Sequence, residues 1–258
     1  MFLVSKQHRN IIYYKARVHL ISEASRTYLS ILWWIVEPIV EMAIFYIVFS
    51  VLLGRGTENY VVFLLVGLVS WQWFANSISH AMNSIDGNRA LISQISFPKI
   101  ILPSVTIAMD GFKFAIVLVT LIGFIAVYGI PPTEHYLALP IILLAQHLIN
   151  CAVANFSALL VPFIPDLKMI VGLVLRAGFF LSGIFYDYHT LPEKVQVYFE
   201  FNPFAQLIDA YRAVLLHNQW PDFQTLGILT ASGLLLVFLS SALLKHYDHK
   251  LPRILAQQ

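Results

Sequence analysis

Long apolar runs separated by short polar connections constrain this chain more than any other feature of its sequence. Hydrophobic residues make up 59% of its 258 residues and charged residues only 12%, a balance too apolar for a soluble domain of this size. Runs of about 20 apolar residues are long enough to cross the hydrocarbon layer of a bilayer as helices. We therefore predict an all-α integral membrane protein that forms one transmembrane domain over residues 1–258.

Turn-forming residues divide the hydrophobic pattern into six predicted transmembrane helices. A short polar connection joins the first two, and Pro131 and Pro132 follow the third. The segment 186–222 is too polar to cross the membrane, although its Leu207 and Tyr211 recur at helical spacing. The predicted spans are 31–53, 60–79, 100–127, 137–164 and 169–185, which together fill 31–185, and 223–244.

Residues 1–30 mix apolar and basic side chains, among them Ile11, Ile12, Lys15 and His19, without reaching the length of a span. This mixture favours an amphipathic helix lying on the cytoplasmic surface of the membrane. The alternative is a partly disordered basic tail whose role is to fix the topology.

Lys and Arg are distributed unequally between alternate connections, and positively charged connections are retained in the cytoplasm. The alternate connections hold only Arg55, Lys194 and Arg212. The termini, the second connection and the fourth hold Lys6, Arg9, Lys15, Arg17, Arg26, Arg89, Lys99, Lys168, Lys245, Lys250 and Arg253. Both termini are therefore expected on the cytoplasmic side.

Five ionisable residues fall within the predicted spans: Glu37, Glu41, Asp110, Lys113 and Arg176. Each costs roughly 2 to 4 kcal/mol at the bilayer centre unless it is paired or hydrated. Asp110 and Lys113 are three residues apart and can pair within their own helix. The two glutamates and the arginine either line a polar pathway or subunit seam, or form structural pairs near the membrane surface.

Aromatic residues gather near the ends of the first two spans. They can form the aromatic belt that is common at membrane interfaces. Alternatively, their flat faces can line a path for a sugar-bearing substrate. The candidates are Trp33, Trp34, Tyr60, Trp71, Trp73 and Phe74.

The sequence contains no phosphate-binding GxxxxGK[ST] loop, no GxSxG, no HExxH and no dinucleotide fingerprint. Cys151 has no second cysteine to pair with, and the net charge of +2 does not indicate a nucleic-acid surface. We expect no catalytic residues, metal or cofactor in this chain, so the energy for any transport has to come from a partner or an ion gradient.

The second cytoplasmic connection has a helical apolar pattern, with Leu91, Ile92 and Ile95 set among polar residues. A short amphipathic helix of this kind can dock into a groove on a partner protein. The alternative is a surface turn stabilised by the bilayer.

These features together resemble the ABC-2-type permeases of bacterial polysaccharide exporters of the O-antigen and capsule type. The resemblance is distributed over most of the chain. Its carriers are LWWIVEP at 32–38, FLLVGL at 63–68, WQWF at 71–74, Leu91-Ile92, FPK at 97–99, Leu191-Pro192, Asn202-Pro203 and Tyr211-Arg212.

The resemblance implies a homodimeric inner-membrane permease with a separate ATPase subunit that binds ATP and Mg²⁺. Its cargo would be a lipid-linked glycan, for which we take an undecaprenyl-linked O-antigen. Capsule or teichoic-acid polymers, or a smaller lipid or drug, are alternatives within the family. An ion-coupled secondary transporter using the intramembrane charges is the alternative from another class.

The resemblance also implies roles for three groups of residues. The aromatic residues named above would line the glycan channel, and a coupling helix would contact the ATPase through Asn88, Arg89, Leu91, Ile92 and Ile95. The segment 186–222 would hold an outer gate of two re-entrant helices at about 192–217, with Asn202, Pro203, Asp209, Tyr211 and Arg212. One departure is Ile164-Pro165-Asp166-Leu167, where the family commonly has an Arg-Asp pair.

Overall fold

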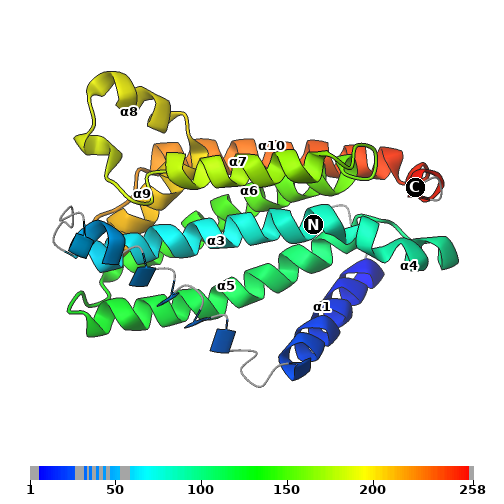
Figure 1. The fold of residues 1–258 in the computed structure, drawn as a ribbon, viewed down its shortest axis with the longest axis horizontal. Helices are drawn as coiled ribbons and strands as arrows, with labels where there is room; N and C mark the ends of the chain where they lie inside the picture. The colour runs from blue at the N-terminus through cyan, green and yellow to red at the C-terminus, as the bar shows by residue number, and fades with distance from the viewer. Residues whose placement is uncertain are drawn as a thin grey trace.

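The computed structural model describes residues 6–26, 32–33, 35–36, 39–40, 43–44, 47–52 and 59–255. All regular secondary structure in these ranges is helical, which confirms the predicted all-α class. Four helical segments are long and apolar enough to cross a membrane (Figure 1). They are α3 (Tyr60–Ser84), α5 (Ile101–Val127), α6 (Leu139–Leu160) with the preceding 3-10 turn η3 (Glu134–Ala138), and α10 (Phe223–Tyr247).

Helix α3 lies at the centre of the bundle, between α5 on one side and α6 on the other. The main core is formed where these three helices meet, because each presents branched apolar side chains there. Its most buried members include Val62, Ile125, Ile142 and Ala145. Helix α10 completes the bundle against α6, where a Cβ atom added at Gly233 would lie 3.0 Å from the Leu148 Cβ.

Helix α1 (Lys6–Arg26) lies outside the bundle and crosses beside α5 (Figure 1). Ala16 is buried against Ile101 and Val105 of α5. Large apolar side chains such as Tyr13 and Val18 are exposed on the helix, beside the exposed basic residue Arg17. The chain therefore forms a helix within the predicted segment 1–30, and the place of that helix on the membrane surface stays a prediction.

The predicted fifth span is shorter than expected. Helix α7 (Leu167–Leu181) has 15 residues, which corresponds to about 22 Å, less than the roughly 30 Å of a hydrocarbon core. The predicted end at Phe185 is wrong, because the chain leaves the helix at Ser182 and Gly183 takes a positive φ of 69°. The predicted spans 60–79, 100–127, 137–164 and 223–244 differ from their helices by a few residues at the ends.

The predicted first span, 31–53, is described only in separate short pieces. The π-helix η1 (Ile47–Leu52) is the longest described piece of it. Trp34, Glu37 and Glu41 lie outside the described residues, so their predicted roles stay predictions.

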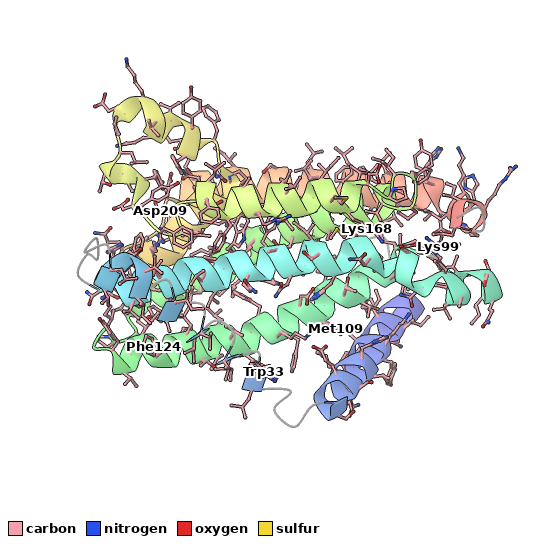
Figure 2. The ribbon with its side chains drawn as sticks, in the orientation of Figure 1. Trp33, Lys99, Met109, Phe124, Lys168 and Asp209 are labelled. Carbon is pink, nitrogen blue, oxygen red and sulfur yellow. The ribbon has the colours of Figure 1, made fainter. Side chains whose placement is uncertain are left out.

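The two ends of the bundle carry different short elements. The α4 end has the 3-10 turn η2 (Asp86–Asn88), α4 (Arg89–Gln94) and the C-terminal helix α11 (Leu251–Leu255). The α8 end has the 3-10 turn η4 (Tyr188–Thr190), α8 (Glu193–Glu200) and α9 (Pro203–Leu215). Figure 2 shows Lys99 and Lys168 at the α4 end and Asp209 at the α8 end.

Candidate functional site

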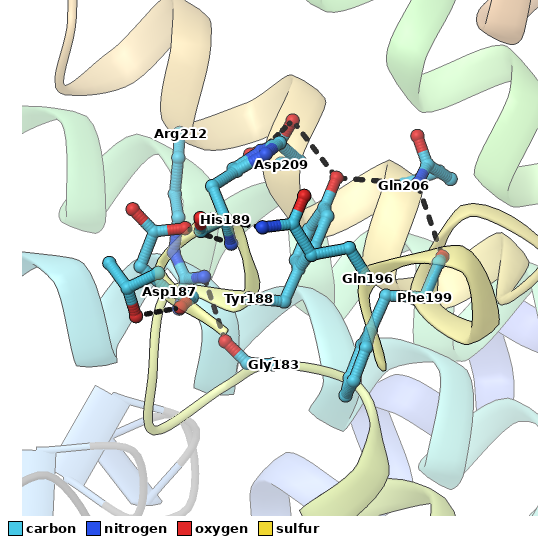
Figure 3. A network of polar contacts seen from close by, with 10 residues as sticks. Gly183, Asp187, Tyr188, His189, Gln196, Phe199, Gln206, Asp209 and Arg212 are labelled. Carbon is cyan, nitrogen blue, oxygen red and sulfur yellow. Dashed lines mark hydrogen bonds and ion pairs between the residues drawn. The ribbon is translucent and has the colours of Figure 1, made fainter. Parts of the chain in front are cut away.

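Arg212 on α9 is a buried cation at the α8 end, with only 4% of its surface exposed. Its guanidinium donates hydrogen bonds of 2.8 Å to the carbonyls of Gly183 and Ile184, and one of 3.3 Å to the carbonyl of Phe63. The guanidinium carbon also lies 3.4 Å from the centre of the Phe63 ring. Arg212 therefore ties α9 to α3 and to the segment that follows α7 (Figure 3).

The start of α9 is fixed by Asn202 and Pro203. The Asn202 side-chain oxygen accepts from the backbone N–H groups of Phe204 at 3.0 Å and Ala205 at 3.4 Å, which is an N-cap. Its amide nitrogen donates to the Leu181 carbonyl at 3.0 Å. Pro203 follows in the first turn, where its missing N–H costs nothing. The Asn-Pro pair thus begins α9 and joins it to the end of α7.

A second polar group surrounds Asp209 on the outer side of α9 (Figure 3). The Tyr188 hydroxyl donates to the Asp209 carboxylate at 3.5 Å, and Gln206 donates to the Tyr188 oxygen at 3.3 Å. His189 lies 3.4 Å from the same carboxylate. Burial, with the nearby Asp209 charge adding to it, raises the pKa of Tyr188, so this hydroxyl stays protonated and remains a donor.

Tyr211 extends the contacts of α9 into the bundle. Its hydroxyl donates to the Gln146 side-chain oxygen at 2.8 Å, and the Gln146 amide donates to the Ser70 carbonyl at 2.7 Å. These groups are buried, so each bond satisfies a polar atom that would otherwise be costly. The structure thus places all five predicted outer-gate residues on or at the start of one helix, and their role in gating stays a prediction.

Asp86 lies two residues before Asn88, the first of the predicted coupling residues, and accepts from Lys168 at 2.6 Å and from Arg89 at 2.5 Å. Hydrogen bonds from Lys168 and then Arg89 hold the pKa of the Asp86 carboxyl below its usual value. Lys168 is the second residue of α7, so this ion pair connects the α4 segment to α7. Figure 2 shows Lys168 on this side of the molecule.

Helix α4 presents two different apolar surfaces. Ile92 is 5% exposed and packs against Ile85, Leu102 and Leu251, whereas Ile95 just beyond the helix is 55% exposed. Leu91 is half-buried, and the Asn88 side chain donates to the Ser84 carbonyl at 2.7 Å. Ile92 therefore holds the helix to the bundle while Ile95 is accessible for contact with another molecule.

Asp110 and Lys113, which have the spacing to pair within α5, both have partners on other helices. His80 of α3 lies 2.9 Å and 3.0 Å from the two Asp110 oxygens, and Lys113 lies 2.5 Å from Glu23 of α1. Because α5 is flanked by α3 and α1, the two side chains reach partners on different helices. Arg176 of α7 donates to the Gly172 carbonyl of its own helix at 3.3 Å, and its role in a polar pathway stays a prediction.

Comparison with known proteins decides the family. Residues 19–216 match the ABC-2 type transporter family, which is more than half of the chain. The chain belongs to the ABC-2 type transporter family. The predicted resemblance is thus confirmed, and membership makes the chain a subunit of a membrane transporter.

Several ABC-2 transporter relatives are similar to this chain over most of its length. It is 28% identical over 225 residues to the O-antigen export system permease protein RfbA of Klebsiella pneumoniae, which is 87% of this chain and 86% of the relative. It is 25% identical over 239 residues to RfbA of Myxococcus xanthus, 92% of each chain. The polysialic acid transport protein KpsM of Escherichia coli is more distant, at 20% over 218 residues, 83% of this chain and 84% of the relative.

The predicted channel aromatics of this ABC-2 transporter subunit have two kinds of environment. Tyr60, Trp71, Trp73 and Phe74 are buried, whereas Trp33 is about half exposed. Trp73 stacks on Phe114, Trp71 packs against Gly178, and the Tyr60 hydroxyl donates to the Phe185 carbonyl at 3.2 Å. Burial gives these four a packing role within the chain, and the channel lining stays a prediction.

Several polar residues of the ABC-2 transporter subunit escaped the sequence analysis. His80 and Gln146 lie in apolar helices. The signal that could have found them is a polar side chain in a mainly apolar helix. Asp86 is one of several carboxylates in the connections between helices. Nothing in the spacing of residues around it indicated its ion pair with the distant Lys168. Lys99 was used for the topology and the family resemblance, and neither showed that its ammonium pairs with Asp248 at 3.2 Å.

Proposed function

We propose that this chain is the permease subunit of an ATP-driven exporter that moves a lipid-linked polysaccharide across the inner membrane. The observation that carries the proposal is its 25 to 28% identity with O-antigen export permeases over most of its length. These relatives favour an undecaprenyl-linked O-antigen as the cargo. This chain is more similar to these permeases than to the polysialic acid transport protein. A capsule polymer is therefore the second candidate for the cargo.

The energy source in this proposal is a separate ATPase, which binds ATP and Mg²⁺ while this chain holds no cofactor. The contact surface on this chain is the α4 end. Ile95 is exposed there, and the Asp86 ion pair with Lys168 links the contact to α7. A movement imposed on α4 therefore has a direct route into the bundle.

The membrane arrangement in the proposal has six spans, with α7 and the segment 31–53 added to the four long helices. Both termini are cytoplasmic in this arrangement, because Lys99 and Lys168 lie at the α4 end (Figure 2), where the C-terminal helix α11 contacts α4. The α8 end, with α9 and its buried Arg212, then faces outward as the gate. Residues 1–30, 31–185, 186–222 and 223–244 form one domain under this arrangement.

A second copy of the chain completes the proposed permease. Helix α7 has no fully buried residue in its 15 residues and exposes Leu173, Val174 and Leu181. Lipid or a second copy can cover such a surface, and the family resemblance favours the copy. The channel for the glycan would then lie between two chains.

The test is co-purification of the tagged chain with the ATPase encoded beside its gene, followed by ATPase activity in lipid. Ile95→Asp is expected to abolish co-purification, because it places a charge on the exposed apolar contact. Val197→Asp is the matched control, since Val197 is a similarly exposed apolar residue on α8 at the opposite end. Co-purification that survives Ile95→Asp would contradict the contact, and a chain that binds no ATPase would favour the ion-coupled alternative.

A further inference from the structure

A polar cleft of about 440 Å³ lies where α1 meets α3 and α5. Three residues of α1 line it, Lys15, His19 and Glu23, and they share one face because they are four residues apart. Leu102, Val105 and Met109 of α5 form its apolar wall, and Figure 2 shows Met109 on the side of α5 near α1. The remaining lining residues are Ser79, His80, Asn83, Ser84, Asn88, Thr106, Asp110 and Lys113.

The two carboxylates of the cleft already have cationic or N–H partners. Glu23 is paired with Lys113 at 2.5 Å, and Asp110 contacts the His80 Nδ1 atom at 2.9 Å. His80 is bonded through Nδ1, and its side chain is 51% exposed. Each carboxylate therefore has a partner within the protein.

Lys15 has a different environment. Its half-buried ammonium donates to the Asn88 side-chain oxygen at 3.4 Å, a long bond to a neutral group. Among the described residues, no carboxylate lies within ion-pair distance of it. Burial lowers the pKa of Lys15, as expected for an ammonium with poor solvation. One helical turn later, His19 is exposed at the same cleft.

We propose that this cleft binds the phosphate group of a lipid from the cytoplasmic leaflet. Lys15 and His19 donate hydrogen bonds to the phosphate oxygens, which supply the negative charge that Lys15 lacks. The wall formed by Leu102, Val105 and Met109 contacts the apolar part of the lipid next to the phosphate. The location fits, because a helix at the membrane interface brings its basic residues to the level of the lipid phosphates.

Two lipids carry this chemistry: a bulk anionic phospholipid and a polyprenyl diphosphate of the kind that would carry an exported glycan. The proposal concerns the phosphate site and does not require that the chain transports anything. Its failure is therefore distinguishable from failure of the proposed function, because lipid binding is measured without the ATPase.

The experiment measures lipid binding to the full-length chain in detergent by native mass spectrometry. Phosphatidylglycerol, a polyprenyl diphosphate and phosphate-free diacylglycerol are titrated separately. Lys15→Gln is expected to weaken binding of the phosphate-bearing lipids by about tenfold, the effect of one charge-assisted hydrogen bond. Arg17→Gln is the matched control, because Arg17 is exposed on the same helix and does not line the cleft.

Stronger binding of both phosphate-bearing lipids than of diacylglycerol, lost in Lys15→Gln and kept in Arg17→Gln, supports the site. A preference for the polyprenyl diphosphate then assigns it to a carrier lipid, and equal binding assigns it to any anionic lipid. Equal effects of the two substitutions, or equal binding of diacylglycerol, overturn the proposal. If Lys15→Gln does not fold, the exposed His19→Gln gives the same test, with weaker binding expected.

Discussion

Lys168, the second residue of α7, donates a 2.6 Å hydrogen bond to Asp86, the first residue of the turn η2 that precedes α4. The two residues are 82 positions apart in the sequence. This contact joins the proposed ATPase-binding segment to a helix with few other contacts in the bundle. It offers a direct structural route by which an event at α4 reaches α7.

Asp86→Asn tests this route. The substitution keeps the size of the side chain and weakens its ion pairs with Lys168 and Arg89, at a cost of about 1 kcal/mol for a partly exposed pair. We expect the ATPase to bind still, while export of the glycan falls several-fold. Purification of the complex checks ATPase binding, and quantification of surface glycan in the same cells checks export. Asp166→Asn is the control, because Asp166 is a nearby exposed carboxylate.

The same ion pairs predict a pH dependence. The pKa of Asp86 is lowered in the folded protein, so its stabilising contribution is present above the unfolded pKa and is lost as pH falls through the folded value. The difference in melting temperature between wild type and Asp86→Asn is expected to be constant from about pH 6 to pH 8 and to shrink below about pH 4. A difference that grows on acidification would contradict the assignment.

Removing the buried guanidinium of Arg212 is expected to be strongly destabilising. Arg212→Met leaves the carbonyls of Gly183, Ile184 and Phe63 without these donors, for an expected loss of about 3 kcal/mol. Arg176→Met, on the exposed side of α7, is the matched control and is expected to change stability little. Thermal unfolding of the two purified variants compares them, and equal melting temperatures would argue against the role of Arg212.

Substitution by alanine is expected to have opposite effects on stability at two glycines of α7, Gly178 and Gly172. A Cβ atom at Gly178 would lie 2.7 Å from the Trp71 ring, which is itself held by Phe74 and Phe204. Gly178→Ala is therefore expected to displace α7 and to cost about 1 to 3 kcal/mol. Nothing lies within 4 Å of a Cβ at Gly172, so Gly172→Ala is expected to be neutral or stabilising by up to about 1 kcal/mol. Thermal stability of the pair separates packing from helix propensity.

The sequence was sufficient to predict the all-α class and four long apolar helices, because long apolar runs leave a membrane chain few choices. The starts of α5 and α10 lie at or beside their predicted positions, since polar and proline-rich connections mark them clearly. The end of α7 was missed because apolar residues continue through Phe185 after Gly183 has turned the backbone.

Polar contacts were harder to predict than helices. Asp110 and Lys113 have the spacing of an intrahelical pair, but helical spacing does not show which neighbouring helix offers a nearer partner. The outer-gate residues were found through family resemblance, and their contacts with Gly183, Ile184 and Gln146 depend on tertiary packing that no local pattern encodes.

Location of the polysaccharide in cells that lack this chain tests the central claim most directly. The glycan is labelled at the cell surface and, after lysis, on its lipid carrier. Our account predicts that the polymer is still made but stays inside on its carrier, and that surface display returns with the wild-type chain only when its ATPase can hydrolyse ATP. Normal surface display without the chain, or its return without ATP hydrolysis, would contradict the account.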